Sequence, residues 1–203
     1  MKYKTLFLLV TMAIFLSACA SNITVTPKYQ ASKKANTSLA SVSTVKVKLE
    51  NFEDKREQQA ESILVGSREA AFGVPMGDVF SERPIFEIVR DAVKTELIRN
   101  GHRIVSNNEN ISIKGKIRKF WVRTDVTALY WDLVGEVNIV IEVSSPTHRT
   151  PVILGPYSGK NIERTYINPS KEIATRVLEK SLEDVMHAMS SDRKLTRVIR
   201  AKR

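Results

Sequence analysis

The residue with the most distinctive chemistry in this sequence is Cys19, the only cysteine among its 203 residues. A disulfide within the chain is therefore excluded, and the thiol is left as a nucleophile. Cys19 follows Leu16 and two small residues, Ser17 and Ala18.

The segment before Cys19 predicts export. Lys2 and Lys4 give a positive start, residues 5–15 are mostly apolar, and small residues follow. That order is typical of a secretory signal peptide. The apolar run is too short for a stable membrane-spanning helix, which needs roughly 20 such residues. We therefore predict that residues 1–18 are a cleaved signal peptide.

The residues Leu16-Ser17-Ala18-Cys19 resemble the lipobox of bacterial lipoproteins. The resemblance implies that the thiol of Cys19 receives diacylglycerol, that the chain is cut just before it, and that an acyl group such as palmitate joins the new amine. About three acyl chains, at about 0.8 kcal/mol per buried methylene, make a permanent anchor. No Asp follows Cys19, so we expect the outer membrane, with the domain facing the periplasm. The alternative is an ordinary cleaved signal followed by an unmodified cysteine.

Composition is consistent with one globular domain outside the cytoplasm. The apolar fraction is 42%, and the formal net charge of +10 becomes +8 when Lys2 and Lys4 leave with the signal peptide. A basic cytosolic chain would suggest nucleic acid, but export removes that partner. The expected partners are the membrane, an envelope protein, and an anionic lipid or peptidoglycan. The alternative is that the charge only keeps the protein soluble.

Residues 19–44 are predicted to be the lipidated cysteine and a flexible tether. The segment is rich in Ser, Thr, Asn, Ala and Lys and has few large apolar residues, a composition typical of disorder. As a flexible coil it would reach about 25–30 Å. Residues 45–203 then form a single domain that stands off the membrane.

The domain is predicted to be an α+β two-layer sandwich, in which two amphipathic helices cover a mixed, mainly antiparallel sheet of about 4–5 strands. The expected strands are residues 45–50, 102–105, 111–124, 133–144 and 152–166, and the expected helices are 81–100, 168–190 and a basic C-terminal helix from 192. Apolar positions change face near Lys119, which predicts a bulge. The long connection 57–82 is apolar enough to pack partly on the sheet, with a short strand at 62–65.

One candidate binding surface lies on the third predicted strand. Lys114, Lys116 and Arg118 alternate along it and share one face, which we call the strand face. Aromatic residues follow, and cations beside aromatic rings could bind an anionic sugar or a lipid headgroup. The alternative is an exposed sheet face or a charged edge that prevents pairing with other chains.

A second candidate surface is the C-terminal helix, which is basic and amphipathic. Its candidate contacts to an anion or a partner are Arg193, Lys194, Arg197 and Arg200. Such a helix is similar to elements that lie on a membrane surface. The alternative is a solvated C-terminus that docks on the domain by its apolar side alone.

The sequence contains no arrangement typical of an enzyme or a metal site. His102, His148 and His187 are far apart, and no zinc-binding or nucleophile-elbow spacing occurs. Asp125 and Asp132 could face one another as an acid–base pair on a glycan or lipid, but solvated surface carboxylates are the simpler interpretation. We therefore predict no catalytic residue, no metal and no cofactor.

Several segments, taken together, resemble the YajG-type family of uncharacterised bacterial lipoproteins. Beside the lipobox they are residues 51–56 (NFEDKR), 63–68 (ILVGSR), 96–102 (ELIRNGH) and the region 173–199. The family has no established activity, so the resemblance assigns no catalytic residue. We expect a non-enzymatic interaction or scaffold module of the cell envelope. The alternatives are a binding module for an anionic component (lipid headgroup, lipopolysaccharide or peptidoglycan) and a glycan or lipid hydrolase.

Overall fold

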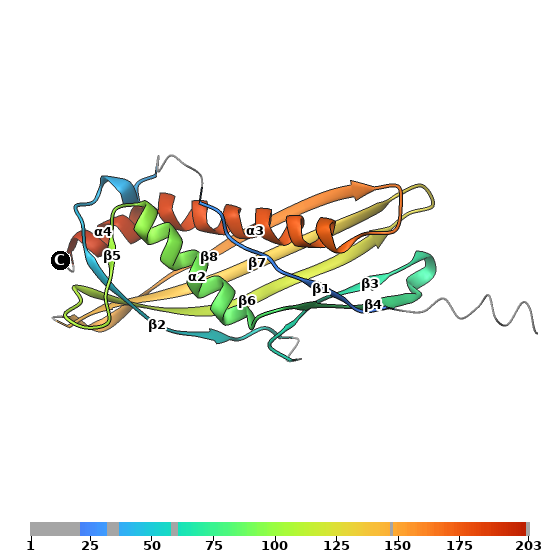
Figure 1. The fold of residues 1–203 in the computed structure, drawn as a ribbon. Coiled ribbons are helices and arrows are strands. Elements are labelled where there is room, and N and C mark those ends of the chain that lie inside the picture. Colours follow the sequence, from blue (N-terminus) through green and yellow to red (C-terminus); the bar gives the residue numbers. More distant parts are fainter. Residues whose placement is uncertain (1–20, 32–36, 58–60, 147, 202–203) are drawn as a thin grey trace, which may run out of the picture.

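The computed structural model describes residues 21–31, 37–57, 61–146 and 148–201, which form a long twisted sheet with helices on one face (Figure 1). The α+β class is confirmed, but the predicted strand number is wrong, because the sheet has eight strands. The strands are β1 (Ile23–Val25), β2 (Lys46–Asp54), β3 (Leu64–Glu69), β4 (Pro75–Ser81), β5 (Arg103–Ile104), β6 (Ile111–Val126), β7 (Trp131–Ser145) and β8 (His148–Thr165). In the described residues the helices are α2 (Ile85–Arg99), α3 (Lys171–Ser191) and α4 (Arg193–Ala201), with short 3-10 turns η1 (Leu39–Ser41) and η2 (Ala71–Gly73).

The three longest strands, β6, β7 and β8, form an antiparallel set in which β8 is an edge of the sheet. β2 pairs in parallel with the first part of β6, and β3 pairs in parallel with its later part. The register between β6 and β7 shifts between Ile117 and Lys119, which confirms the predicted bulge. Because of this extra residue, Ile117 and Phe120 both reach the core and are fully buried.

The additional strands come from segments without a clear apolar period. Residues 57–82 contain the antiparallel hairpin β3–β4, of which only a short strand at 62–65 was predicted. β1 pairs in parallel with β4 and extends the sheet beyond that hairpin. These strands are short, and apart from the β3–β4 hairpin itself they pair with strands distant in the sequence, so packing decides them more than local alternation does.

The predicted flexible tether is wrong for residues 21–31 and 37–44, which belong to the folded domain. Ile23 pairs with Val79 of β4, and Leu39 is fully buried. The segment is polar on average, but its few apolar residues lie where the domain can bury them. Average composition therefore understates how much of this segment folds.

A buried carboxylate also holds the N-terminal segment to α2. Glu96 is fully buried and accepts hydrogen bonds from the Tyr29 hydroxyl at 2.5 Å and from the Asn100 side chain at 3.0 Å. It also forms an ion pair with Arg99. Burial alone would raise the pKa of Glu96, but the hydrogen bonds from Arg99 and Tyr29 hold it below its ordinary value. The charge is thus satisfied inside the protein.

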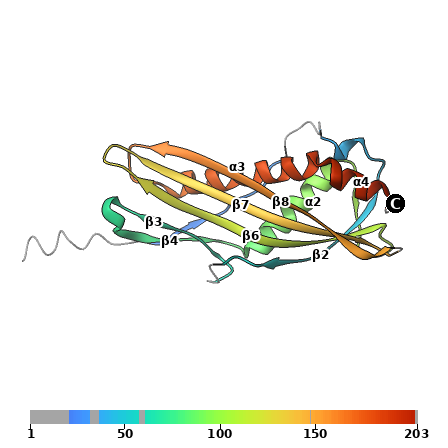
Figure 2. The same cartoon turned by 180° about the vertical axis from the view of Figure 1, so that it is seen from behind.

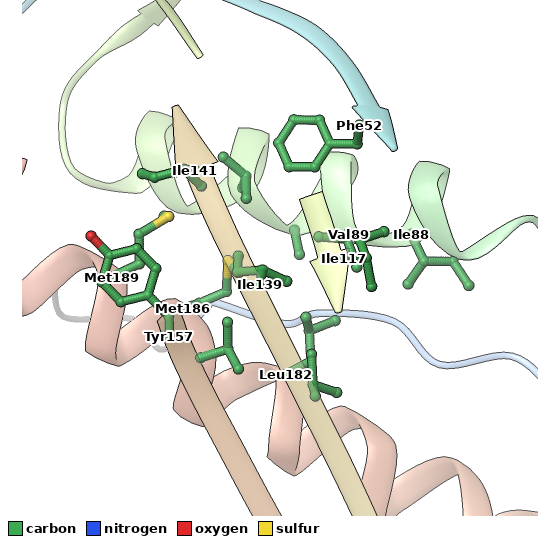
Figure 3. Close-up of a cluster of buried hydrophobic side chains, with 14 of the residues drawn as sticks. Phe52, Ile88, Val89, Ile117, Ile139, Ile141, Tyr157, Leu182, Met186 and Met189 are labelled. Atoms are coloured by element: carbon green, nitrogen blue, oxygen red, sulfur yellow. The ribbon is translucent and has the colours of Figure 1, made fainter. Parts of the chain in front are cut away.

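The core lies between the sheet and the two long helices (Figure 3). The buried side chains drawn there include Ile88 and Val89 of α2, Leu182, Met186 and Met189 of α3, and Ile117, Ile139, Ile141 and Tyr157 of the sheet. Glycines let α3 lie directly on two strands. A Cβ added at Gly159 would lie 2.0 Å from the carbonyl oxygen of Ser181, and one at Gly135 would lie 2.7 Å from that of Val177.

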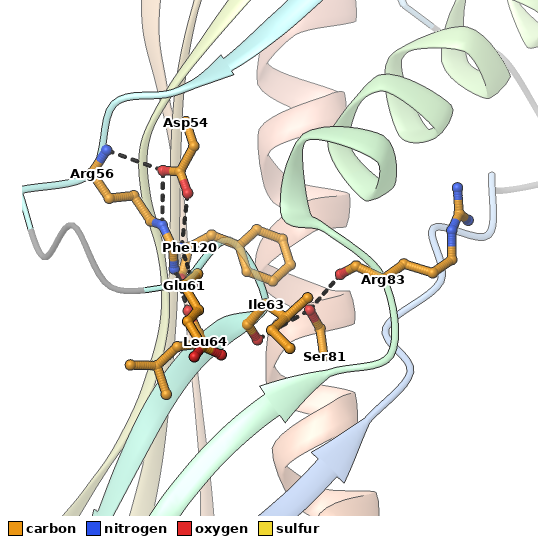
Figure 4. Close-up of polar contacts among 8 residues, drawn as sticks. All are labelled: Asp54, Arg56, Glu61, Ile63, Leu64, Ser81, Arg83 and Phe120. Carbon is orange, nitrogen blue, oxygen red and sulfur yellow. Dashed lines mark hydrogen bonds and ion pairs between the residues drawn. The ribbon is translucent and has the colours of Figure 1, made fainter.

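A buried arginine joins three strands (Figure 4). Arg56 is 3% exposed, and its guanidinium donates two hydrogen bonds to Asp54 at 3.0 and 2.9 Å. It also donates to the carbonyl oxygens of Leu64 at 2.6 Å and Phe120 at 3.2 Å. The group therefore connects the end of β2 to β3 and β6 while its charge stays paired.

The molecule is elongated, and its two ends are built differently (Figures 1 and 2). One end holds η1, β5 and α4. The other holds the η2 turn of the β3–β4 hairpin, the β6–β7 turn and the β8–α3 connection. The 21 residues of α3 run between them, a length of about 30 Å. None of the helices in the described residues is long and apolar enough to cross a membrane.

Candidate functional site

The predicted lipid-attachment residue, Cys19, lies outside the described residues, but its neighbourhood is defined by Ser21. The Arg68 guanidinium of β3 donates a hydrogen bond to the Ser21 carbonyl oxygen. The next residue, Asn22, accepts a hydrogen bond of 2.9 Å from the backbone nitrogen of Asp78. The chain that follows the predicted anchor is therefore fixed beside the β3–β4 hairpin.

The strand face lies on the side of the sheet opposite the helices, as its alternation predicted. Lys114 is 3.3 Å from Glu50 and Lys116 is 3.9 Å from Glu142. Arg118 is exposed at the bulge. Carboxylates from neighbouring strands thus lie beside both lysines and offset much of the positive potential expected there.

The same compensation continues along β7. Glu136 pairs with Lys119, and lies 3.8 Å from Arg123 and 3.7 Å from Lys160. The hydrogen bond from Lys119 holds the pKa of Glu136 below its ordinary value, and the three cations reinforce this shift. The centre of the open sheet is therefore a set of fixed, paired charges.

The basic C-terminal segment forms α4 and docks on the domain. Leu195 and Ile199 are fully buried or nearly so, at 1% and 0% exposure. The predicted contacts Arg193, Lys194, Arg197 and Arg200 are all exposed. The helix therefore uses its apolar side for packing, and its cations remain accessible.

Three of these cations surround a pocket of about 450 Å³, which we call the basic pocket. The pocket is lined by Arg193, Arg197, Arg200, Ser38, Ser41 and Thr196. Arg200 donates a hydrogen bond of 3.1 Å to the Ser41 hydroxyl. In the part of the chain that the structure describes, no carboxylate lines the pocket or pairs with its arginines. Guanidinium and hydroxyl groups in this arrangement are donors for a carboxylate or a phosphate.

The serine side of the basic pocket could not be found from the sequence. Ser38 and Ser41 lie in the segment that composition assigned to a tether. Ser41 is 159 residues from Arg200, and their contact is created only when α4 packs against η1. No local pattern reports such a distant contact.

The carboxylates Asp125 and Asp132 are cross-strand partners between β6 and β7. Each, however, is paired with an arginine. Asp125 is 3.1 Å from Arg123, and Asp132 accepts two hydrogen bonds of 2.8 Å from Arg164. The Arg164 guanidinium lowers the pKa of Asp132, whereas a general acid needs a raised pKa. The pair is thus placed together but not tuned for acid–base cleavage.

The described histidine side chains, His102 and His187, lie in different surroundings. His102 is buried, its Nδ1 accepts a long hydrogen bond of 3.4 Å from the Val45 nitrogen, and burial lowers its pKa. His187 is exposed on α3, and the side chain of His148 is not among those that the structure describes. Within the described residues there is no group of three or more potential metal ligands.

A larger pocket, about 570 Å³, lies between β2 and α2 and includes part of the NFEDKR segment. Its charges pair with one another, because Arg83 is 3.1 Å from Glu87 and 2.8 Å from Asp91. The basic pocket is smaller but lacks such internal pairing, and it is therefore the better candidate for binding an ion.

Residues 27–200 match the model of a protein family described as uncharacterised lipoprotein. The chain belongs to this lipoprotein family. Membership confirms the resemblance drawn from the lipobox and the later segments, and it implies a protein anchored to a membrane of the cell envelope. No curated protein matches this chain.

One solved structure has a fold similar to that of this lipoprotein. Protein XCC0632 from Xanthomonas campestris, of the family model DUF330, has a TM-score of 0.59 at 8% identity, covering 89% of this chain and 99% of that one. A minor lipoprotein from Acinetobacter baumannii has a TM-score of 0.37 at 11% identity, covering 77% and 92%. At these identities the likeness concerns the fold, and function must be argued from the sites.

Proposed function

We propose that this lipoprotein is a non-enzymatic interaction module of the outer membrane, with its domain in the periplasm, and that it binds an anionic envelope component in the basic pocket. The observation that carries the proposal is the pocket itself. Three arginines line it together with Ser38, Ser41 and Thr196, and no carboxylate is among the lining residues in the described part of the chain. Arginine binds carboxylate and phosphate groups through paired, charge-assisted hydrogen bonds.

The position of the basic pocket favours a ligand away from the anchoring membrane. The pocket lies on α4, whereas Ser21 lies beside Gly77 towards the other end of the molecule. The length of α3 between these ends, about 30 Å, exceeds the screening length of about 8–10 Å for exposed charges. This favours the carboxylates of peptidoglycan over the headgroups of the membrane that holds Cys19.

Pelleting with purified peptidoglycan sacculi tests this proposal. One variant replaces the three arginines of the basic pocket with glutamine, and a matched control replaces the three strand-face residues with glutamine. Both remove three positive charges, so non-specific attraction falls equally. We expect the pocket variant to bind sacculi at least about tenfold more weakly, because charge-assisted hydrogen bonds are lost. Unchanged binding by the pocket variant would contradict the proposal.

Vesicles of phosphatidylethanolamine and phosphatidylglycerol provide the second arm of the same experiment, with a protein that lacks the lipid (Cys19→Ser). Binding to sacculi that depends on the basic pocket, with little pocket-dependent binding to vesicles, supports peptidoglycan as the ligand. The reverse result identifies a lipid headgroup instead. Both interactions should weaken as salt rises, because the arginines are exposed.

A partner protein on the open sheet face is a second candidate, favoured by apolar residues among the paired charges. Ile153 is 68% exposed and Ile162 is 54% exposed, both on β8. Photo-crosslinking from position 162 in intact cells, compared with exposed position 98 of α2, tests it. A discrete crosslinked protein only from position 162 is expected, and equal recovery from both positions would count against this candidate.

A further inference from the structure

One end of the molecule carries most of its large, exposed apolar side chains. Phe72 is 104% exposed, Leu129 is 79%, Tyr166 is 74% and Ile167 is 73%, and Val74 beside them is 55%. They belong to the β3–β4 hairpin, the β6–β7 turn and the β8–α3 connection. Both views place these three connections at the same end (Figures 1 and 2).

The three connections are also free of charge. Residues 70–74 read AAFGV, residues 127–130 read TALY and residues 166–169 read YINP, in a chain that is 27% charged. We call these residues the uncharged end. Moving these three connections out of water would desolvate no ionised side chain of their own, which lowers the cost of burial. The nearest charge is Arg164, which stacks on the Tyr130 ring at 3.5 Å and is paired with Asp132 at the margin of this end.

Hydrogen bonds between strands hold the uncharged end together. The Thr124 hydroxyl near the end of β6 donates to the Glu69 carbonyl oxygen at 2.8 Å and accepts from the Glu69 nitrogen at 2.7 Å. Trp131 at the start of β7 pairs with Thr165 at the end of β8. The strands that carry the three connections are therefore joined to one another, which brings the connections together at one end.

The backbone at the hairpin supports exposure of Phe72. This residue has a φ of 63° in the left-handed region, which is rare for a bulky side chain. A strained conformation that presents a fully exposed aromatic ring is a feature found at contact surfaces.

The predicted lipid is close to this end because Ser21 touches β4 and Cys19 is only two residues before Ser21. A Cβ at Gly77 would lie 2.6 Å from the Ser21 carbonyl oxygen, so the two backbones touch. Gly77 is three residues from Val74, about 10 Å along a strand. Cys19 is two residues from Ser21, which limits their separation to about 7 Å.

We propose that the uncharged end lies in the interface of the bilayer that holds the lipid of Cys19, as a second membrane contact that fixes the orientation of the domain. This inference rests on the acylated Cys19 of the proposed function. Aromatic and aliphatic side chains partition into the membrane interface. Because the anchor keeps the domain at the surface, even a weak apolar contact is effective there. The orientation places the basic pocket on the side away from the bilayer.

Single-cysteine labelling of the acylated protein tests the inference. The thiol of acylated Cys19 is blocked, so Phe72→Cys, Leu129→Cys and Ile167→Cys each introduce one reactive thiol for an NBD fluorophore. The matched control is Ile153→Cys, an equally exposed apolar residue on the open sheet face. The labelled proteins are reconstituted into phosphatidylethanolamine and phosphatidylglycerol vesicles.

At the uncharged end we expect quenching by lipid-borne nitroxide that is several-fold stronger than at position 153, and several-fold weaker quenching by aqueous iodide. Equal quenching at all four positions would overturn the inference. A second result would also overturn it. In unacylated Cys19→Ser protein without vesicles, the labels could become protected from iodide as the protein concentration rises. A second copy of the protein would then cover this end.

Intact-mass measurement of the same samples separates the two proposals. An acylated protein whose uncharged end remains in water contradicts this inference alone. An unmodified Cys19 contradicts both the proposed anchor and the proposed orientation. Binding of the basic pocket to sacculi is measured separately and does not depend on either result.

Discussion

The Arg68 guanidinium donates a hydrogen bond to the carbonyl oxygen of Ser21, the residue two positions after Cys19. Arg68 is only 6% exposed and also donates to the Met76 carbonyl oxygen at 3.1 Å. The bond joins the beginning of the described chain to the β3–β4 hairpin. The predicted lipid attachment site is therefore only two residues from a hydrogen bond that holds the chain to the domain.

Replacing this arginine should loosen the N-terminal strand. In Arg68→Ala the carbonyl oxygens of Ser21 and Met76 lose their donor, which costs roughly 1–3 kcal/mol. Hydrogen exchange should speed up in β1 while the core of β7 stays protected. The control Arg123→Ala removes an exposed arginine of the neighbouring strand and should leave exchange in β1 unchanged. Unaltered exchange in Arg68→Ala would mean that pairing with β4 alone holds β1.

The buried arginine that follows β2, Arg56, should matter much more for stability than an exposed one. Arg56→Ala leaves Asp54 unpaired and two backbone oxygens without a donor, so the free energy of unfolding should fall by about 3–5 kcal/mol. Urea unfolding measures this change.

The control for Arg56 is Arg83→Ala, which removes an exposed pair with Glu87 and Asp91. Its expected cost is about 0–1 kcal/mol. Similar losses in Arg56→Ala and Arg83→Ala would show that the hydrogen bonds drawn in Figure 4 do not stabilise the junction of β2, β3 and β6.

Because α3 packs directly on β8 at Gly159, adding one methyl group at this residue should lower the stability of the protein. In Gly159→Ala the new Cβ would meet the Ser181 carbonyl oxygen at 2.0 Å, so the helix must move. We expect a loss of about 1–3 kcal/mol in thermal or urea unfolding, as for overpacked cores. Ser158→Ala, at the exposed neighbouring position, is the control and should be close to neutral.

Stability should decrease on mild acidification because of His102. Burial lowers the pKa of this imidazole below its ordinary value of about 6.5, so the unfolded chain binds the proton more readily. The contribution of the neutral side chain is present above about pH 6.5 and is lost as the pH falls from there through the folded-state pKa. His102→Gln should flatten the pH dependence of unfolding between about pH 7 and 5. An unchanged slope in His102→Gln would contradict this origin.

The long elements were predictable because one face of each is repetitively apolar. α2, α3, β6, β7 and β8 show their period over many residues, and even the bulge near Lys119 follows from a change of face. β1 and η1 were not predictable, because β1 is three residues long and η1 is a single turn. Their positions depend on partners such as Val79 and Arg200, far along the chain.

The candidate sites also contain some features that a local sequence pattern predicts and others that depend on distant segments. The exposure of the strand face and of the α4 cations follows from alternation and amphipathicity. The carboxylates that offset the strand face, and the serines that complete the basic pocket, arise from pairing between distant segments. The uncharged end carries a local signal, since its three connections lack charge, but only the sheet register shows that they meet.

Both proposals depend on the lipid at Cys19, and intact-mass spectrometry of the protein extracted from its native membrane tests that most directly. The account predicts a mature chain that begins at Cys19 and carries diacylglycerol and an N-acyl group. A chain that retains residues 1–18, or one whose Cys19 is unmodified, would contradict it.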